Sequence, residues 1–463
     1  MRRSLVRFRG RVSAGSRGAA SWIAGLGLLA LTAITDAIPP RIRFGRWNAV
    51  MNRCLAFEGG LPSIPATEPL WQESARSSLH PATDMKCLIV AGALDTGGVE
   101  TVVAALAEGL PELGIRTEVV CSEEGRVSKR LKERGAIVTR LSGEGLARYV
   151  EDSCPDVIQL HRIDPSMCIS LRAWASRTVS VFHAMESYLD KASWTAFSDF
   201  ERRGPGSIAV SESVADFFAP RLSRLPTIVP NGVPDPVHNI ADRHESERTS
   251  LARALGTNFA TSDIIVVALQ RFSDQKNAAG LVDAFLLAAE VNSHLRLVMA
   301  GHPNSWLEVR RADAARRSHP LGRRVHLLGD SDPAPLLLGG DVYALDSFAE
   351  GGPVSAVEAA ACGLPLVLSD VGFARQLVQT SGVSGRVVPR ANANMSQASI
   401  ASERRRRHQS NRHAFAHALL EVASSPARTS ARVPDGFTLE SMVAGHAQVL
   451  REVSDLHTAR RTR

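Results

Sequence analysis

The sequence predicts an α/β protein made of two doubly wound, Rossmann-like domains that face each other across a cleft. From Met85 onward, short continuous apolar runs, typical of parallel strands buried on both faces, alternate with stretches of helical periodicity. The alternation breaks at residues 231–250, which are rich in proline and charge, and then restarts, so the chain carries the same kind of unit twice. Because ligands bind at the carboxyl ends of the strands in such folds, we expect a site between the two units.

The predicted elements follow one another along the chain. Apolar runs predict strands at 86–92, 117–121, 136–141, 157–160, 179–182, 208–210 and 227–230 in the first unit, and at 264–269, 295–301, 325–329, 341–345 and 365–369 in the second. Helical periodicity predicts helices at 101–110, 276–291, 333–338 and 353–362. We therefore divide the chain into a basic and apolar N-terminal extension with a linker (1–84), a first Rossmann-like domain (85–232), a second (233–435), and a C-terminal helix expected to pack back on the first domain (436–463).

The composition is that of a globular protein, since 44% of the 463 residues are hydrophobic and 22% are charged, and the chain is too long for one ordinary domain. The net charge of +7 is uneven, because residues 1–84 and 390–463 each carry +6 and residues 85–389 carry −5. A groove that binds nucleic acid along the body is therefore not expected. The six cysteines are scattered, with no C-x-x-C pair, which argues against a disulfide scaffold or structural zinc and favours a reducing compartment.

The N-terminal extension contains an uncharged stretch, residues 18–35, with arginines on both sides. A cleaved signal peptide, a transit peptide, a single membrane span and a segment lying in the headgroup region all remain open, as does a helix that packs on the body. The flanking arginines favour contact with an anionic membrane surface. Residues 59–84, rich in Pro, Ser, Thr and Ala, predict a linker, and Met51 and Met85 are alternative start positions.

Two carboxylates stand out in the second unit. Glu350 follows a predicted strand in a Gly-Gly-Pro loop, and Glu358 lies inside the next predicted helix. The backbone amides of Gly351, Gly352 and Val354 are free to meet an anionic or hydroxylated ligand at the start of that helix. The two carboxylates could accept hydrogen bonds from two separate diols, such as a sugar and a ribose, although either alone also fits an ordinary helix with a surface glutamate.

Two cations precede these carboxylates in the same unit. Arg271 and Lys276 lie five positions apart in a loop between the first predicted strand of the unit and a helix. Cations at a strand end beside a helix N-terminus predict a clamp for a diphosphate. Lys276 is one of only five lysines in the chain, which weakens the alternative that both are solvated surface cations.

Five elements in this order resemble the GT-B retaining glycosyltransferases of glycosyltransferase family 4 (group 1). They are the Gly97-Gly98 loop with Val99-Glu100, the segment Val229-Pro230-Asn231-Gly232-Val233, the R-x4-K loop, the E-x7-E segment with its following ACGLPLV, and residues 436–442. The resemblance covers about residues 85–455. It implies an enzyme that moves a sugar from a nucleotide-diphosphate sugar to a hydroxyl acceptor, with the acceptor on the side of the first domain and the nucleotide sugar on the second.

The resemblance also implies a role for each candidate residue. Arg271 and Lys276 would bind the donor diphosphate and neutralise the leaving group. Glu358 would bind the ribose and Glu350 the donor sugar, with the amides of Gly351, Gly352 and Val354 reaching sugar hydroxyls or phosphate. Gly97 and Gly98 would let the backbone approach phosphate and acceptor closely, and His183 would lie near the donor sugar, although it also fits an ordinary structural histidine.

The resemblance implies no metal and no other cofactor. It also implies that the leaving phosphate itself helps to deprotonate the incoming hydroxyl, so that no protein nucleophile is required. Glu350 is therefore not interpreted as the nucleophile of a carboxylate pair. Asp330-Ser331-Asp332 is formally a D-x-D metal motif of a different glycosyltransferase fold, but it precedes a predicted helix and is interpreted as an N-cap. The expected partners are a nucleotide sugar, a lipid-linked or polysaccharide acceptor of the cell envelope, and an anionic membrane surface on its cytoplasmic face, with no nucleic acid.

The sequence departs from the family pattern at three places. Gly351-Gly352-Pro353 replaces the usual aromatic-Gly pair, and Gln270 replaces the usual glycine before Arg271. These changes keep open an alternative function, in which a catalytically altered GT-B scaffold serves as a nucleotide-binding or partner subunit. The third departure is the arginine run 404–407, which predicts either a solvated face or a second basic patch for lipid phosphates.

Overall fold

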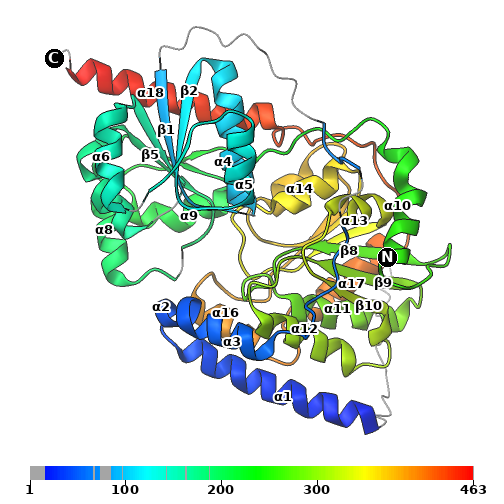
Figure 1. Cartoon of the computed structure of the whole chain (residues 1–463). Coiled ribbons are helices and arrows are strands. Elements are labelled where there is room, and N and C mark those ends of the chain that lie inside the picture. The colour runs from blue at the N-terminus through cyan, green and yellow to red at the C-terminus, as the bar shows by residue number, and fades with distance from the viewer. Residues whose placement is uncertain are drawn as a thin grey trace, which may run out of the picture.

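The computed structural model describes residues 16–65, 68–72, 85–95, 97–141, 143–161, 164–186 and 188–461 (Figure 1). The strands are β1 Met85–Leu94, β2 Ile115–Glu124, β3 Val138–Arg140, β4 Val157–Leu160, β5 Thr178–Phe182, β6 Ser207–Ala209, β7 Thr227–Ile228, β8 Ile264–Leu269, β9 Leu295–Ala300, β10 Val325–Leu328, β11 Val342–Leu345, β12 Leu366–Ser369 and β13 Gly385–Val388. The helices are α1 Ser16–Ala37, α2 Pro40–Ile42, α3 Asn48–Leu55, α4 Gly98–Gly109, α5 Arg126–Glu133, α6 Gly143–Ser153, α7 Pro165–Ser170, α8 Lys191–Glu201, α9 Glu212–Phe218, α10 Ile240–Ala254, α11 Ala278–Val291, α12 Trp306–Arg317, α13 Pro333–Gly339, α14 Val354–Ala361, α15 Ala374–Gln379, α16 Gln397–Arg404, α17 Arg412–Ala423 and α18 Leu439–Arg461.

The strands form two separate parallel sheets. Within the described residues, the first sheet has seven strands in the order β3-β2-β1-β4-β5-β6-β7, and the second has six in the order β10-β9-β8-β11-β12-β13. In each sheet the order runs outward in both directions from the first strand, which is the doubly wound arrangement with a switch point beside that strand. The prediction of two Rossmann-like α/β domains is confirmed.

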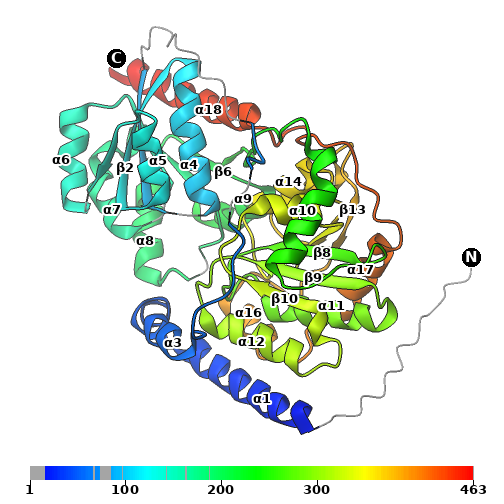
Figure 2. The same cartoon turned by 45° about the vertical axis from the view of Figure 1, so that its right-hand side comes forward.

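The central strands form because their residues are apolar on both faces. Residues Cys87–Ala91 of β1 are at most 1% exposed, and Ile265–Ala268 of β8 are fully buried. Helices cover both faces of each sheet in Figures 1 and 2, which is why these strands show no alternation of polar and apolar residues.

The break predicted at residues 231–250 is wrong in its second half, where α10 begins at Ile240. Its charges are paired within the fold, since Arg243 bonds Glu247 at 2.7 Å one turn along and Arg248 bonds Asp341 at 2.8 Å. The high charge of this stretch was therefore wrongly interpreted as a break, although it belongs to a helix that packs on α13.

Helix α18 crosses back to the first domain (Figure 1). Its residues Val443, Ala447 and Leu450 join the buried cluster of β1 and α4. The C-terminal segment thus ties the two domains together.

The N-terminal helices lie along the second domain, with α1 beside α12 and α16 in both views (Figures 1 and 2). Further on, the carbonyls of Pro62 and Ile64 accept hydrogen bonds of 2.8 Å from the amides of Gly329 and Asp332. The described part of the predicted linker is therefore packed on the second domain, while residues 66–67 and 73–84 lie outside the described residues. Among the described helices, none is both long and apolar enough to cross a bilayer.

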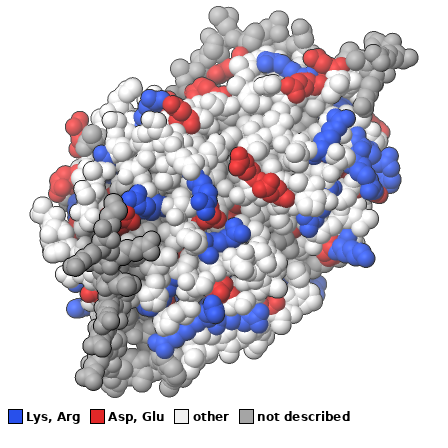
Figure 3. Space-filling view, turned by 180° about the vertical axis from the view of Figure 1, so that it is seen from behind, with Lys and Arg blue, Asp and Glu red and all other residues white. Residues whose placement is uncertain are grey.

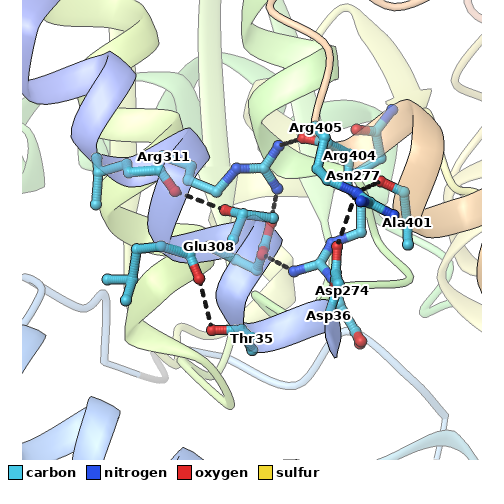
Figure 4. Close-up of polar contacts among 12 residues, drawn as sticks. Thr35, Asp36, Asp274, Asn277, Glu308, Arg311, Ala401, Arg404 and Arg405 are labelled. Carbon is cyan, nitrogen blue, oxygen red and sulfur yellow. Dashed lines mark hydrogen bonds and ion pairs between the residues drawn. The ribbon is translucent and has the colours of Figure 1, made fainter. Parts of the chain in front are cut away.

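The arginine run 404–407 is not uniformly solvated. Arg404 is 2% exposed and bonds Asp36 of α1 and Glu308 of α12 (Figure 4), whereas the three arginines after it are exposed. The prediction of a solvated face or lipid-phosphate patch is therefore wrong for Arg404, because acidic partners far away in the sequence surround it.

On the face seen in Figure 3, basic and acidic side chains are interspersed.

Candidate active site

A pocket of about 400 Å³ lies between the two domains. Its first wall comes from the start of α4 and the loop after β5, and its second from the loops after β8, β9 and β11 and the start of α14. All ten predicted site residues line it, namely Gly97, Gly98, His183, Arg271, Lys276, Glu350, Gly351, Gly352, Val354 and Glu358. The fold thus brings these ten residues to one place from four separate stretches of sequence, 97–98, 183, 271–276 and 350–358.

Lys276 and Glu350 form an ion pair inside this pocket. The Lys276 Nζ donates to Glu350 Oε1 at 2.5 Å, and the two side chains are 16% and 9% exposed. The Ser347 hydroxyl donates to the same oxygen at 2.7 Å. Since both of the bonds that Glu350 makes to described residues end on Oε1, its second oxygen can accept a hydrogen bond from a ligand.

A buried amide network holds the loop that carries Lys276. Asn277 adopts the left-handed conformation with φ of 46°, and its Nδ2 lies 2.8 Å from Asp346 Oδ2 and 2.6 Å from Gln409 Oε1. Burial raises the pKa of Asp346 to about 7, and Asn411 donates to its other oxygen at 2.9 Å. These residues were not among the predicted site residues. The sequence carried a signal for two of them, because Asp346 directly follows the predicted strand 341–345 and Asn277 directly follows Lys276.

Arg271 is exposed at the pocket, five positions before Lys276. The adjacent Gln270 is only 5% exposed, with its Nε2 3.5 Å from Met299 Sδ. Gln270, which stands where the family usually has a glycine, is therefore largely buried beside the loop that carries Arg271 and Lys276.

Glu358 lies half-buried on α14, and burial raises its pKa to about 7. The neighbouring Ser355 hydroxyl donates to the Leu269 carbonyl at 3.0 Å and lies 2.7 Å from the Tyr343 hydroxyl. These bonds fix the start of α14 against the end of β8. The helix begins at Val354, with Pro353 at the N-cap position, one residue later than predicted.

The glycines allow the two domains to approach closely. The Gly351 carbonyl accepts a 2.7 Å hydrogen bond from the Ser211 hydroxyl of the first domain. A Cβ placed on Gly98 would lie 3.7 Å from Val354 of the second domain, and Gly97 has a φ of 150°, in the region that favours glycine. The walls of the pocket are therefore in contact with each other.

His183 begins a series of hydrogen-bonded side chains that runs from the pocket into the first domain. Its Nε2 lies 2.9 Å from His161 Nδ1, His161 Nε2 lies 2.9 Å from Gln159 Oε1, and Gln159 Nε2 lies 2.8 Å from His446 Nδ1 on α18. Burial lowers the pKa of His183 to about 4 and that of His446 to about 3. Of these four residues, only His183 is marked by the sequence pattern.

The D-x-D sequence has structural partners. The Asp332 carboxylate accepts from the Ala334 amide and caps α13, as interpreted from the sequence. Asp330 lies 3.0 Å from His302 Nδ1 and 3.5 Å from the Arg126 guanidinium of the first domain.

Two Rossmann-like domains that close on a pocket with cations and carboxylates from the second domain define the GT-B class of glycosyltransferase. The family model for Glycosyltransferase Family 4 matches residues 96–235, and the model for glycosyl transferases group 1 matches residues 256–415. The chain belongs to the group 1 glycosyltransferases, which confirms the resemblance and identifies it as an enzyme that transfers a sugar from a nucleotide sugar.

Solved structures share this fold at low identity. HepE from Anabaena, in complex with UDP and glucose, is 19% identical with a TM-score of 0.60, and the match covers 80% of this chain and all of HepE. Sucrose-phosphate synthase from Thermosynechococcus elongatus is 16% identical with a TM-score of 0.59, over 80% of this chain and 99% of that one. WaaG, a glycosyltransferase of lipopolysaccharide biosynthesis, is 13% identical with a TM-score of 0.53, over 79% and 99%. No curated protein matches the sequence.

Proposed function

We propose that this chain is a retaining, metal-independent glycosyltransferase that uses a nucleotide-diphosphate sugar and acts on a hydroxyl of a cell-envelope glycolipid or polysaccharide. The observation that carries the proposal is the Lys276–Glu350 pair, with Arg271 exposed in the same interdomain pocket. This arrangement offers cations to a diphosphate and a fixed carboxylate to a sugar. HepE, a protein of the same fold, was solved with UDP and glucose, which supports a donor of this class.

The residues suit a displacement in which the acceptor approaches on the face that the phosphate leaves. The bond from the sugar carbon to the phosphate oxygen breaks, a bond to the acceptor oxygen forms, and the hydroxyl proton passes to the leaving phosphate. Arg271 and Lys276 neutralise the charge that grows on the diphosphate. Glu350 and Glu358 orient sugar and ribose, and His183, whose pKa is lowered to about 4 by burial, stays neutral near pH 7.

The exposed face of α1 supports the proposal of a membrane-located acceptor. Leu26 and Ile34 are 45% and 55% exposed, and Gly27, Ala30 and Ala37 are exposed on the same helix, so this face carries no charge over the part of α1 whose side chains are described, residues 25–37. Ile42 and Phe44, which follow α1 in the sequence, are also exposed, at 55% and 47%. An apolar face of this kind suits the interfacial region of a membrane, so we propose peripheral attachment on the cytoplasmic side.

Vesicle flotation tests this attachment. The full chain is expected to float with anionic vesicles of phosphatidylglycerol, and Ile34→Glu is expected to reduce the bound fraction. Ile137→Glu is the matched control, because Ile137 is 53% exposed on the first domain. Equal flotation of the two variants would contradict the proposal.

Transfer is tested with a panel of nucleotide sugars selected by thermal shift, followed by assays with envelope lipid and polysaccharide acceptors. NMR of the product anomeric centre should show the donor configuration, and chelation should leave the rate unchanged. Unchanged turnover in both Glu350→Ala and Lys276→Ala would exclude the mechanism. Nucleotide binding without turnover on every acceptor would instead support the alternative, an altered scaffold, which the replacement at Gln270 and in the Gly351-Gly352-Pro353 loop favours.

A further inference from the structure

The N-terminal segment, residues 36–52, reaches the loop that holds both predicted donor cations. Arg43 Nη2 lies 2.6 Å from Asp274 Oδ2, and Asp274 stands between Arg271 and Lys276 in that loop. The same nitrogen lies 2.9 Å from Asp36 Oδ1, and the Arg43 side chain is only 9% exposed. A contact made by a nearly buried arginine between two carboxylates is much less screened by solvent than a surface ion pair.

The segment also contacts the next loop of the pocket. The side-chain amides of Asn48 and Asn52 donate to the Asn304 carbonyl at 3.0 and 3.1 Å, and Asn52 Oδ1 accepts from the Trp306 amide at 2.9 Å. This loop begins with Gly301 and His302, which line the pocket.

The two loops are bonded to each other as well. The Phe272 amide donates to the His302 carbonyl at 2.9 Å, and the Ser305 amide donates to the Phe272 carbonyl at 2.8 Å. Residues 36–52 therefore contact both of these pocket loops, and the two loops are also bonded to each other.

The start of the segment is itself fixed by a buried ion network (Figure 4). Asp36 pairs with Arg404, Arg404 lies 2.6 Å from Glu308, and Glu308 lies 2.7 Å from Arg311. The side chains of Asp36, Arg404 and Glu308 are each at most 2% exposed. Because partial disruption leaves a buried charge unpaired, such a network favours one fixed position of the segment.

We propose that residues 36–52 position the donor loops and that Arg43, through Asp274, is a positioning residue for nucleotide-sugar binding. The inference rests on the proposed donor function of Arg271 and Lys276. The segment precedes both regions that the family models match, so this device is supplied from outside the matched domains. Loss of the Arg43 contact is expected to let the loop, and with it both cations, move away from the diphosphate.

Titration calorimetry with UDP and with GDP on the full chain tests the proposal. Arg43→Ala is expected to weaken binding of the nucleotide that the wild type prefers about tenfold. Arg43→Lys should recover part of the affinity, and in the transfer assay KM for the donor should rise more than kcat falls. Arg46→Ala is the matched control, since Arg46 is exposed in the same segment, and should bind like the wild type.

A second variant separates positioning from folding. Asp274→Asn leaves Arg43 paired with Asp36 at 2.9 Å and the contacts among Asp36, Arg404 and Glu308 in place. Circular dichroism at the assay temperature should therefore show a folded protein, and binding should be weakened as in Arg43→Ala. If Lys276→Ala loses binding while Arg43→Ala and Asp274→Asn match the wild type, the positioning role is overturned and the donor function stands. If the wild type binds neither of these nucleotides nor any nucleotide sugar of the thermal-shift panel, the donor function fails and this inference fails with it.

Discussion

Gly351 of the second domain lies directly against the backbone of His183 of the first. A Cβ on Gly351 would lie 1.8 Å from the His183 carbonyl oxygen, a backbone atom that cannot turn aside. Gly351→Ala is therefore expected to force the domains apart and misplace the donor relative to the acceptor side. We expect turnover to fall on the order of 100-fold, with a larger radius of gyration in small-angle scattering.

A glycine away from the pocket provides the control for that change. A Cβ on Gly143, at the start of α6, would meet its nearest neighbours at 3.6 Å, which is ordinary contact. Gly143→Ala should keep the wild-type rate and scattering profile. Wild-type turnover in Gly351→Ala would show that the closed arrangement is not needed for transfer.

The raised pKa of Glu358 predicts a pH dependence of nucleotide binding. Burial raises this pKa from 4.5 to about 7, so the side chain is neutral below about pH 7 and ionised above it. A carboxylate accepts from both hydroxyls of a ribose, whereas the acid must keep one proton, so affinity should rise as the pH increases through 7. Calorimetry with a nucleotide sugar, whose diphosphate diester does not titrate in this range, measures this on the wild type between pH 5.5 and 8.5, and Glu358→Gln should bind weakly with a flat profile.

The raised pKa of Glu358 also predicts a pH dependence of folding stability, which should fall as the pH rises, whereas nucleotide affinity should increase. Since the folded state holds the Glu358 proton more tightly than the unfolded state, its contribution to stability falls as the pH rises from about 4.5 to about 7. Glu358→Gln removes this loss, so its melting temperature should exceed that of the wild type more at pH 8 than at pH 5. A difference independent of pH would mean that Glu358 is solvated in solution.

The local sequence pattern was sufficient to predict those elements whose structure depends on their own residues alone. The apolar run 264–269 predicted β8 with its true bounds, because a strand buried on both faces must be apolar throughout. The pocket residues could be found because they follow such strands. Arg404 could not be placed in this way, since its burial depends on Asp36, 368 positions earlier. The Asn277–Asp346–Gln409 network likewise joins three distant segments that no local period marks.

The hydrogen-bond chain behind His183 predicts a positioning role for Gln159. With the Gln159 oxygen accepting from His161 Nε2, the Nδ1 of His161 is an acceptor, so His183 donates from Nε2. The Nδ1 of His183, buried and unpaired among the described residues, is then left as an acceptor for a ligand hydroxyl. Gln159→Leu is expected to lower kcat about tenfold with little change in donor affinity, and to add little in a His183→Ala background.

A pH profile distinguishes this role from a purely structural one. The rate is measured at saturating donor, where the effect of Glu358 on affinity no longer contributes. Because the pKa of His183 is lowered to about 4, this rate should show no histidine inflection between pH 6 and 7 and should fall only as the pH approaches 4. Full additivity of Gln159→Leu and His183→Ala would contradict a connected chain.

The contact between Arg404 and Asp36 predicts that two neighbouring arginines differ greatly in their effect on stability. Arg404→Met leaves Asp36 and Glu308 buried beside each other without their shared cation, and the expected cost is about 3 kcal/mol. Arg406→Met removes only the pair with Glu403, in which the arginine is 55% exposed, and should cost less than about 1 kcal/mol. Differential scanning calorimetry of both variants measures this contrast, with the first variant melting well below the second. Equal melting temperatures would contradict the buried network of Asp36, Arg404 and Glu308.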